Sequence, residues 1–181
     1  YSDTTPGDYL LYKPAEGKFE RVAEVRPGHR ADLMANVELH RSKTRDGADL
    51  PVWMTKTEAG PAGRRPAVVL VHGGPWVRGG EWGWDSEAQF LATRGYVVIE
   101  PEFRGSTGFG DAHYRAGWKQ WGQLMQDDVA DALRFAVDKG WVDPSKVCIA
   151  GASYGGYATL MGLARHKDLY KCGVAWVAVT D

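Results

Sequence analysis

The residues best suited to catalysis lie at positions 151–155, which read Gly-Ala-Ser-Tyr-Gly. An apolar run at 146–150 precedes them, and a helix-forming stretch follows to about Arg165. A serine at a sharp turn from strand to helix holds its hydroxyl clear of the sheet, and glycines two residues before and after it prevent collisions across the turn. The pattern therefore predicts Ser153 as a nucleophile for acyl transfer. A glycine-rich turn that binds phosphate, or binds nothing, is the alternative.

A second segment, His-Gly-Gly-Pro at 72–75, follows an earlier apolar run. In serine hydrolases with a nucleophile turn of this kind, a backbone N–H from such a loop joins the N–H that follows the serine, and together they bind the oxyanion. These donors would be Gly74 and Tyr154, and losing one donor typically costs ~3–4 kcal/mol in the barrier. A plain Gly-Pro turn is the other interpretation.

The histidines within the sequence are poor candidates for the general base. His72 precedes the proposed oxyanion loop, so we expect it to order that loop through hydrogen bonds. His166 follows Ser153 by thirteen residues along one predicted helix, which separates them by about 20 Å. His113 and His166 are therefore predicted to be surface or structural residues.

Apolar runs and amphipathic stretches alternate along the chain and predict an α/β fold. Parallel strands joined by right-handed helical crossovers form a mostly parallel sheet with helices on both faces. The predicted strands are residues 67–71, 96–99, 146–150 and 173–179, and the predicted helices are residues 86–94, 123–139 and the stretch that ends near 165. Asp85 or Ser86 should cap the first helix, and Asp143-Pro144 should turn the chain back before its third strand.

Two antiparallel pairs are predicted ahead of this region. Residues 37–41 and 50–56 alternate in hydrophobicity and are joined by a turn at Asp46-Gly47. Residues 8–24 form a hairpin around a turn at 14–17. An isolated hairpin is marginally stable in water, so this one needs a sheet to join.

Composition excludes several functional classes. The chain has 181 residues, 44% apolar and 25% charged, with a net charge of −1. Nothing supports nucleic-acid or membrane binding as the main role, and no apolar run approaches the roughly 20 residues that span a bilayer. The chain starts at Tyr1 without methionine, so we expect the true N-terminus to be missing, and a cytoplasmic or periplasmic location stays open.

Cysteines and tryptophans allow further predictions. Two cysteines, Cys148 and Cys172, are too few for a disulfide framework, and we expect free, buried thiols rather than a bridge or metal site. No metal or organic cofactor is expected. Five tryptophans in or beside Gly-rich stretches form either the walls of a pocket or interface, or a cluster that packs the loops: Trp76, Trp82, Trp84, Trp118 and Trp121.

The ordered set of motifs resembles the prolyl oligopeptidase (S9) family of serine peptidases, in particular its acylaminoacyl-peptidase-like and dipeptidyl-peptidase-like branches. The resemblance covers most of residues 48–181 and is carried by residues 69–76, 96–101, 104–110, 121–123, 127–128, 141–144 and 151–157. It implies an α/β-hydrolase fold, truncated after the nucleophile turn and the next strand. Residues 1–30 would be the tail of a preceding β-propeller with a linker, and residues 31–181 the N-terminal part of the catalytic domain.

By position, Ser153 matches the family's nucleophile, and Gly74 and Tyr154 match its oxyanion donors. Arg104 and Asp127 match motif positions with structural roles, a loop anchor and a polar partner at the helix. The resemblance also implies that the triad's acid and histidine lie beyond residue 181, so Asp181 is expected to be structural or at the pocket edge.

The predicted function is therefore a serine peptidase that cleaves short peptides through an acyl-enzyme on Ser153, with the 181-residue piece alone inactive. A carboxylesterase or lipase and a non-catalytic binding module are the alternatives. A peptide substrate is the expected partner, and the oligomeric state stays open.

Overall fold

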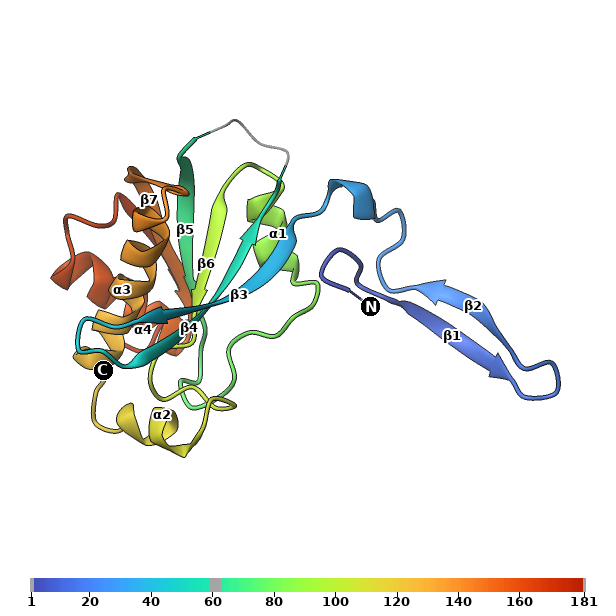
Figure 1. Ribbon diagram of the computed structural model, residues 1–181, viewed down its shortest axis with the longest axis horizontal. Coiled ribbons are helices and arrows are strands. Elements are labelled where there is room, and N and C mark those ends of the chain that lie inside the picture. Colours follow the sequence, from blue (N-terminus) through green and yellow to red (C-terminus); the bar gives the residue numbers. More distant parts are fainter. Residues whose placement is uncertain (1, 59–62, 181) are drawn as a thin grey trace.

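The computed structural model describes residues 2–58 and 63–180 of the chain (Figure 1). The strands are β1 (Asp8–Lys13), β2 (Lys18–Glu24), β3 (Asn36–Lys43), β4 (Asp49–Lys56), β5 (Arg65–Val71), β6 (Val97–Pro101), β7 (Val142–Ala152) and β8 (Cys172–Trp176). The helices are α1 (Ser86–Ala92), α2 (Asp111–Ala116), α3 (Leu124–Asp138) and α4 (Tyr154–Arg165), with a 3₁₀ turn at Ala31–Leu33.

Six strands form one sheet in the order β3-β4-β6-β5-β7-β8. β3, β4 and β6 pair antiparallel, whereas β6, β5, β7 and β8 run parallel. Because β5, β6 and β7 are covered on both faces, their sequences read as continuous apolar runs rather than as alternating ones. The predicted α/β class with a mostly parallel sheet is confirmed.

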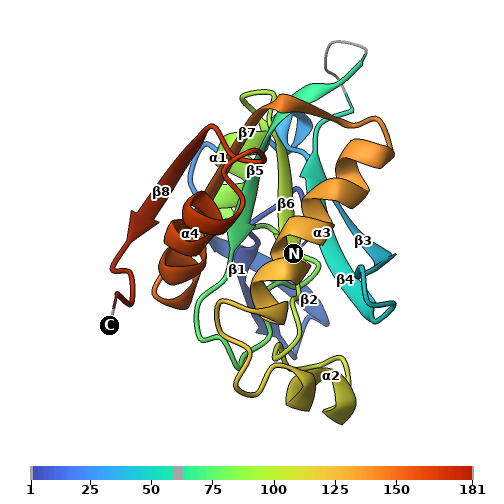
Figure 2. The same cartoon turned by 90° about the vertical axis from the view of Figure 1, so that its left-hand side faces the viewer.

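Helices cover both faces of this sheet, and Figure 2 shows α3 and α4 on one side with α1 on the other. The larger core lies beneath α3 and α4, and the smaller one beneath α1. The predicted apolar face of α3 is confirmed, since Met125, Val129, Leu133 and Ala136 are all buried. No helix among the described residues is both long and apolar enough to cross a membrane.

The N-terminus of α1 agrees with prediction. Asp85 caps it, because the Asp85 Oδ1 atom accepts hydrogen bonds from the backbone N–H groups of Glu87 at 2.9 Å and Ala88 at 2.8 Å. α1 leads back to β6 through Gly95, which has a φ of 92°. Such a left-handed residue at the end of a helix is usually glycine.

Two strand boundaries differ from the prediction. β7 begins at Val142, which pairs with Arg65, and the pairing resumes only at Val147 opposite Ala67. Asp143-Pro144 therefore belongs to an exposed bulge inside β7 rather than to a turn before it. Turn and bulge favour the same residue types, so composition does not distinguish them. β8 ends at Trp176, three residues before the predicted end of that strand at 179.

The prediction of free cysteines is wrong, because Cys148 and Cys172 form a disulfide. β7 and β8 are adjacent parallel strands whose register places these residues directly opposite one another. Their Cα atoms are 4.7 Å apart, within the range that a disulfide spans. Cys172 is exposed and Cys148 half-buried.

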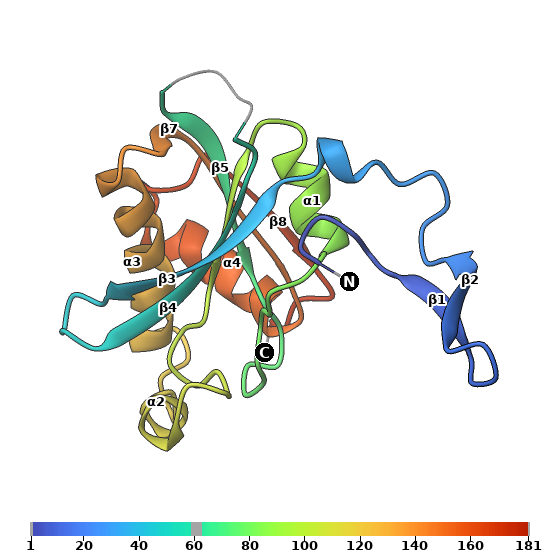
Figure 3. The same cartoon turned by 45° about the vertical axis from the view of Figure 1, so that its right-hand side comes forward.

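The β1–β2 hairpin forms where predicted and projects from the body of the molecule, as Figure 3 shows. It is a separate two-stranded sheet with exposed apolar side chains, including Tyr9 at 63% and Phe19 at 69%. That residues 1–30 are a propeller tail remains a prediction.

Candidate active site

Ser153 lies at the corner between β7 and α4, with its side chain exposed. Its φ is 57° and its ψ is −119°, a backbone conformation that non-glycine residues rarely adopt and that often marks functional sites. The corner is held by the backbone, since Tyr157 N–H donates to Ser153 O at 3.0 Å and Ser153 N–H to Trp176 O at 3.2 Å. This strand, sharp turn and helix match the sequence prediction.

Gly151 and Gly155 allow β5 to approach this corner. A Cβ atom added to Gly151 would lie 2.5 Å from the Val71 carbonyl oxygen, and one added to Gly155 would overlap the same oxygen. The end of β5 therefore packs directly against the turn that holds Ser153. Since β5 leads into the loop at 72–85, this close approach brings that loop to the serine.

Gly73 and Gly74 lie beside the serine. A Cβ on Gly73 would be 3.4 Å from Ser153 Cβ and 4.0 Å from Ser153 Oγ. Gly74 has a φ of 113°, and a Cβ there would be 2.9 Å from Val77 Cγ2. Gly74 therefore requires glycine, whereas a side chain at Gly73 would be a tight fit. Within the described residues the Gly74 N–H makes no hydrogen bond, and Tyr154 N–H belongs to the first turn of α4, where N–H groups lack helical partners.

His72 fixes the direction of the Gly73–Gly74 peptide. Its Nδ1 lies 2.7 Å from Gly73 O, and its Nε2 lies 2.9 Å from Ser106 Oγ. A carbonyl only accepts, so Nδ1 carries the proton. Burial lowers the pKa of His72, which leaves Nε2 to accept from the Ser106 hydroxyl. Because Gly73 C=O and Gly74 N–H share one planar trans peptide, they point in opposite directions, and holding the first aims the second.

In the part of the chain that the structure describes, no histidine hydrogen-bonds the Ser153 hydroxyl. His113 Nε2 lies 3.1 Å from Phe103 O. His166 lies at the C-terminal end of α4, 3.7 Å from Asp127 Oδ1. Both have the structural surroundings predicted for them.

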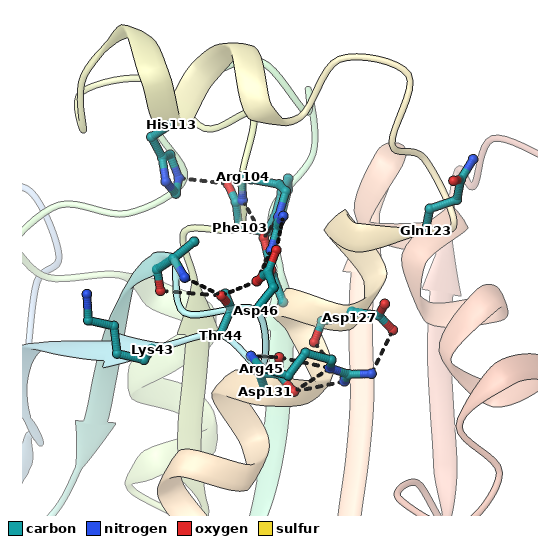
Figure 4. Close-up of polar contacts among 12 residues, drawn as sticks. Lys43, Thr44, Arg45, Asp46, Phe103, Arg104, His113, Gln123, Asp127 and Asp131 are labelled. Atoms are coloured by element: carbon teal, nitrogen blue, oxygen red, sulfur yellow. Dashed lines mark hydrogen bonds and ion pairs between the residues drawn. The ribbon is translucent and has the colours of Figure 1, made fainter.

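Arg104 anchors the loop after β6, as predicted. Its backbone N–H and guanidinium both donate to Asp128 of α3, at 2.8 Å from N and Nε to Oδ2 and at 2.7 Å from Nη2 to Oδ1. Two further bonds of 2.9 Å reach Asp46 in the β3–β4 turn (Figure 4). The arginine thereby ties three segments together and holds the loop that carries Ser106.

Asp127 contacts a different set of residues. Its Oδ1 lies 3.2 Å from Arg45 Nη1 and 3.3 Å from Arg165 Nη2, and Figure 4 shows it beside Arg45. It therefore joins α3 to the end of α4 and to the β3–β4 turn, which fits the predicted polar partner at the helix. Asp181 lies outside the described residues. Among the described residues no group of three or more His, Cys, Asp or Glu is arranged to hold a metal ion.

Comparison with known proteins identifies the family. The model of the prolyl oligopeptidase family (peptidase S9) matches residues 82–181. The chain belongs to this family. The predicted resemblance is therefore confirmed.

Two relatives of this chain carry the names of peptidases. It is 45% identical over 194 residues to dipeptidyl peptidase family member 6 of Caenorhabditis elegans, with 96% of the chain and 26% of that protein covered. It is 37% identical over 173 residues to dipeptidyl aminopeptidase BIII of Pseudoxanthomonas mexicana, with 92% of the chain and 25% of that protein covered. The chain thus spans about a quarter of the length of these relatives.

Solved structures of similar proteins confirm the α/β-hydrolase fold. A puromycin-hydrolyzing peptidase of Mycobacterium tuberculosis superposes with a TM-score of 0.84 at 26% identity, over 99% of this chain and 28% of that one. An acylaminoacyl peptidase of Pyrococcus horikoshii gives a TM-score of 0.79 at 24% identity, over 98% of this chain and 28% of that one.

The tryptophans of this family member differ in exposure and in the rings that they contact. Trp121 packs on the core, with its ring centroid 4.7 Å from that of Tyr154. Trp84 lies in a T-shaped contact with His29, at 5.7 Å between ring centroids. Three others are about half exposed: Trp76 at 48%, Trp82 at 50% and Trp118 at 49%.

Sequence reasoning missed four residues that hold these loops: Asp46, Glu102, Ser106 and Asp128. Three of them lie within motifs that were recognised, but a motif does not say which side chain points inward. No local signal marks Glu102, because the predicted strand ended at residue 99 and the acidic residue directly after it is Glu100.

Proposed function

We propose that this chain supplies the nucleophile and oxyanion hole of a serine peptidase. The observation that carries the proposal is the exposed Ser153 at a corner with a φ of 57°, beside the Gly73–Gly74 loop. Backbone strain of this kind is retained where it serves a function. The family membership supports hydrolysis of peptide bonds.

In the proposed reaction, Ser153 Oγ attacks the carbonyl carbon of the scissile peptide bond and loses its proton to a general base. The resulting oxyanion accepts hydrogen bonds from the Gly74 and Tyr154 N–H groups, and the N-terminal end of α4 adds a favourable dipole. Collapse of the tetrahedral intermediate releases the amine, which takes the proton from the base. Water then hydrolyses the acyl-enzyme by the same steps.

The general base and its acid partner are proposed to come from sequence that follows position 181 in the full-length protein. Two observations support this proposal. The chain spans about a quarter of the relatives' length, and both ring nitrogens of His72 bind other groups. A serine without a base keeps only its weak intrinsic nucleophilicity, so the 181-residue chain alone should be inactive.

We propose short peptides as substrates, and dipeptide p-nitroanilides as the first to test. The two relatives described above are a dipeptidyl peptidase and a dipeptidyl aminopeptidase. A p-nitrophenyl ester measured in parallel would detect the esterase alternative, which predicts turnover of the ester with none of the anilide.

The test is covalent labelling of the full-length protein with a fluorophosphonate. We expect one labelled residue, Ser153, and expect Ser153→Ala to abolish both labelling and peptide hydrolysis. Ser145→Ala is the matched control, because Ser145 is exposed in the β7 bulge and hydrogen-bonds Asp143. Labelling at another residue, or full activity in Ser153→Ala, would overturn the proposal.

A further inference from the structure

Glu102 directly follows β6 in the sequence. Its side chain contacts the loop at 72–85, which carries Gly74. The residue is 1% exposed. Its Oε2 accepts a hydrogen bond from Gly79 N–H at 3.1 Å, and its Oε1 accepts from Gly80 N–H at 2.5 Å and from the indole N–H of Trp53 at 3.2 Å. One carboxylate thus binds two successive backbone amides of the loop.

In the part of the chain that the structure describes, no arginine or lysine forms an ion pair with this carboxylate. Among the described residues its one ion-pair neighbour is the ring of His72, whose Nε2 lies 3.7 Å from Glu102 Oε2. Burial of a carboxylate without a cation is costly unless hydrogen bonds compensate for the lost water, and N–H groups that donate to a carboxylate form strong bonds. The three N–H donors therefore fix where this side chain and the loop sit relative to each other.

The loop at 72–85 also borders a small cavity next to Glu102. A cavity of about 210 Å³ is lined by Gly73, Gly79, Gly80 and Glu102, together with residues of β5, β6 and β7. Glycines carry no side chains that could fill such a space. The hydrogen bonds from Gly79 and Gly80 to Glu102 therefore act together with ring contacts. An added Cβ would overlap His72 Cδ2 at Gly79 and would lie 2.6 Å from Trp53 Cδ1 at Gly80.

A short chain of contacts joins Glu102 to the Gly74 N–H. Gly79 lies against the His72 ring, since a Cβ on Gly79 would come 2.5 Å from His72 Cγ. The ring also stacks on Phe103, with centroids 4.3 Å apart and planes 13° apart. The imidazole therefore contacts both Gly79 and Phe103, and its Nδ1–H holds Gly73 O, which aims the Gly74 N–H.

We propose that Glu102 is a positioning residue for the oxyanion hole. By holding Gly79 and Gly80, it keeps the His72 ring against Phe103 and the Gly73–Gly74 peptide in its reactive orientation. This inference rests on the proposed function and adds a specific residue to it. Hydrogen-bond donors aimed in advance at the oxyanion stabilise the transition state without reorganisation during the reaction.

The test is Glu102→Gln in the full-length protein with a dipeptide p-nitroanilide. The amide keeps the size of the side chain but turns an NH₂ group toward one of the backbone N–H donors. We expect kcat to fall by about tenfold to a hundredfold, less than the 10²–10³ for loss of a whole donor, with KM unchanged within about twofold. Affinity for a dipeptide boronic acid, which places an oxygen at the oxyanion position, should fall by the same factor.

The matched control is Asp131→Asn, which also alters a buried, hydrogen-bonded carboxylate, here one bound by Arg45 and Arg134. It should lower thermal stability and leave kcat and boronate affinity unchanged. If Glu102→Gln does not fold, Glu102→Asp is measured instead, because it retracts the carboxylate by one methylene and should lower kcat in the same way.

Two results separate this inference from the proposed function. Wild-type kcat and boronate affinity in a folded Glu102 variant, alongside an inactive Ser153→Ala, would overturn the role of Glu102 alone. Activity that survives Ser153→Ala would overturn the proposed function, and the role of Glu102 with it.

Discussion

Glu100 lies in β6 next to several other carboxylates, and this environment alters its ionisation. Burial, reinforced by the negative charges of Asp85, Glu102 and Glu87, raises the pKa of Glu100 from 4.5 to about 8. The folded chain therefore keeps a proton on Glu100 at neutral pH that the unfolded chain releases.

This difference predicts how stability depends on pH. Below about pH 4.5 the carboxyl group is protonated in both states, so its stabilising effect is fully present. Between about pH 4.5 and 8 the folded state binds more protons, so stability falls as pH rises, by at most about 1.4 kcal/mol per pH unit. Urea unfolding of Glu100→Gln from pH 5 to 8 should show a flatter dependence than that of the wild type.

Glu16→Gln is the control for this experiment, because Glu16 is exposed in the β1–β2 turn. Its pH dependence should match that of the wild type. Identical slopes for wild type and Glu100→Gln would show that Glu100 ionises alike in the folded and unfolded chain.

At the scale of single residues, the sequence predicted site features formed by neighbouring residues. It did not predict contacts between residues far apart in the chain. Ser153 and its flanking glycines form one short motif, so its corner could be predicted from local pattern alone. The contacts of Glu102 with Gly80, and of Ser106 with His72, join residues 22 and 34 positions apart. Such pairs depend on strand order and loop path, which no local pattern encodes.

Among the elements, the loop after β6, helix α3 and the β3–β4 turn are joined through Arg104. The side chains of Arg104 and Asp128 are 7% and 1% exposed, whereas that of Asp46 is 41% exposed. Removing one partner of a buried ion pair leaves the other charge without compensation. Replacing Asp128 should therefore lower the free energy of unfolding much more than replacing Asp46.

We predict that Asp128→Asn lowers the free energy of unfolding by about 3–5 kcal/mol. Asp46→Asn, the matched variant on the same arginine, should cost about 1 kcal/mol or less because water screens that pair. Urea denaturation followed by fluorescence measures both. Equal costs for the two variants would contradict the division of roles between these aspartates.

Elements with a continuous apolar run or a periodic apolar face were predicted, whereas a helix with neither was missed. α3 has a continuous apolar face, and its length was found to within about a residue at each end. α2 has no buried residue, so it leaves no periodic signal and was missed. The disulfide was missed because it depends on the register between β7 and β8, which the sequence does not show.

For the whole molecule, the β1–β2 hairpin is the least integrated part. Within the described residues its strands pair only with each other, and Val25 N–H donates to Gly7 O at 3.2 Å. The residues that flank the hairpin, Gly7 and Val25, are therefore neighbours in space. The aromatic side chains of the hairpin are exposed, and the assignment of residues 1–30 to a propeller tail stays a prediction.

We predict that deletion of residues 8–24 changes the free energy of unfolding of the six-stranded sheet by less than about 1 kcal/mol. Urea unfolding followed by tryptophan fluorescence is a suitable measurement, since no tryptophan lies in the deleted segment. Met54→Ala, at a fully buried position in β4, is the positive control and should cost about 2–5 kcal/mol. A comparable loss on deletion would mean that the hairpin supports the sheet.

The bond between Cys148 and Cys172 closes a covalent ring in the chain, with the two cysteines 24 positions apart in sequence. Ser153 and the whole of α4 lie inside this ring. A protease that cuts once between the two cysteines would therefore open the backbone without releasing a fragment. The proposed nucleophile would stay attached to the sheet, and only reduction would separate the pieces.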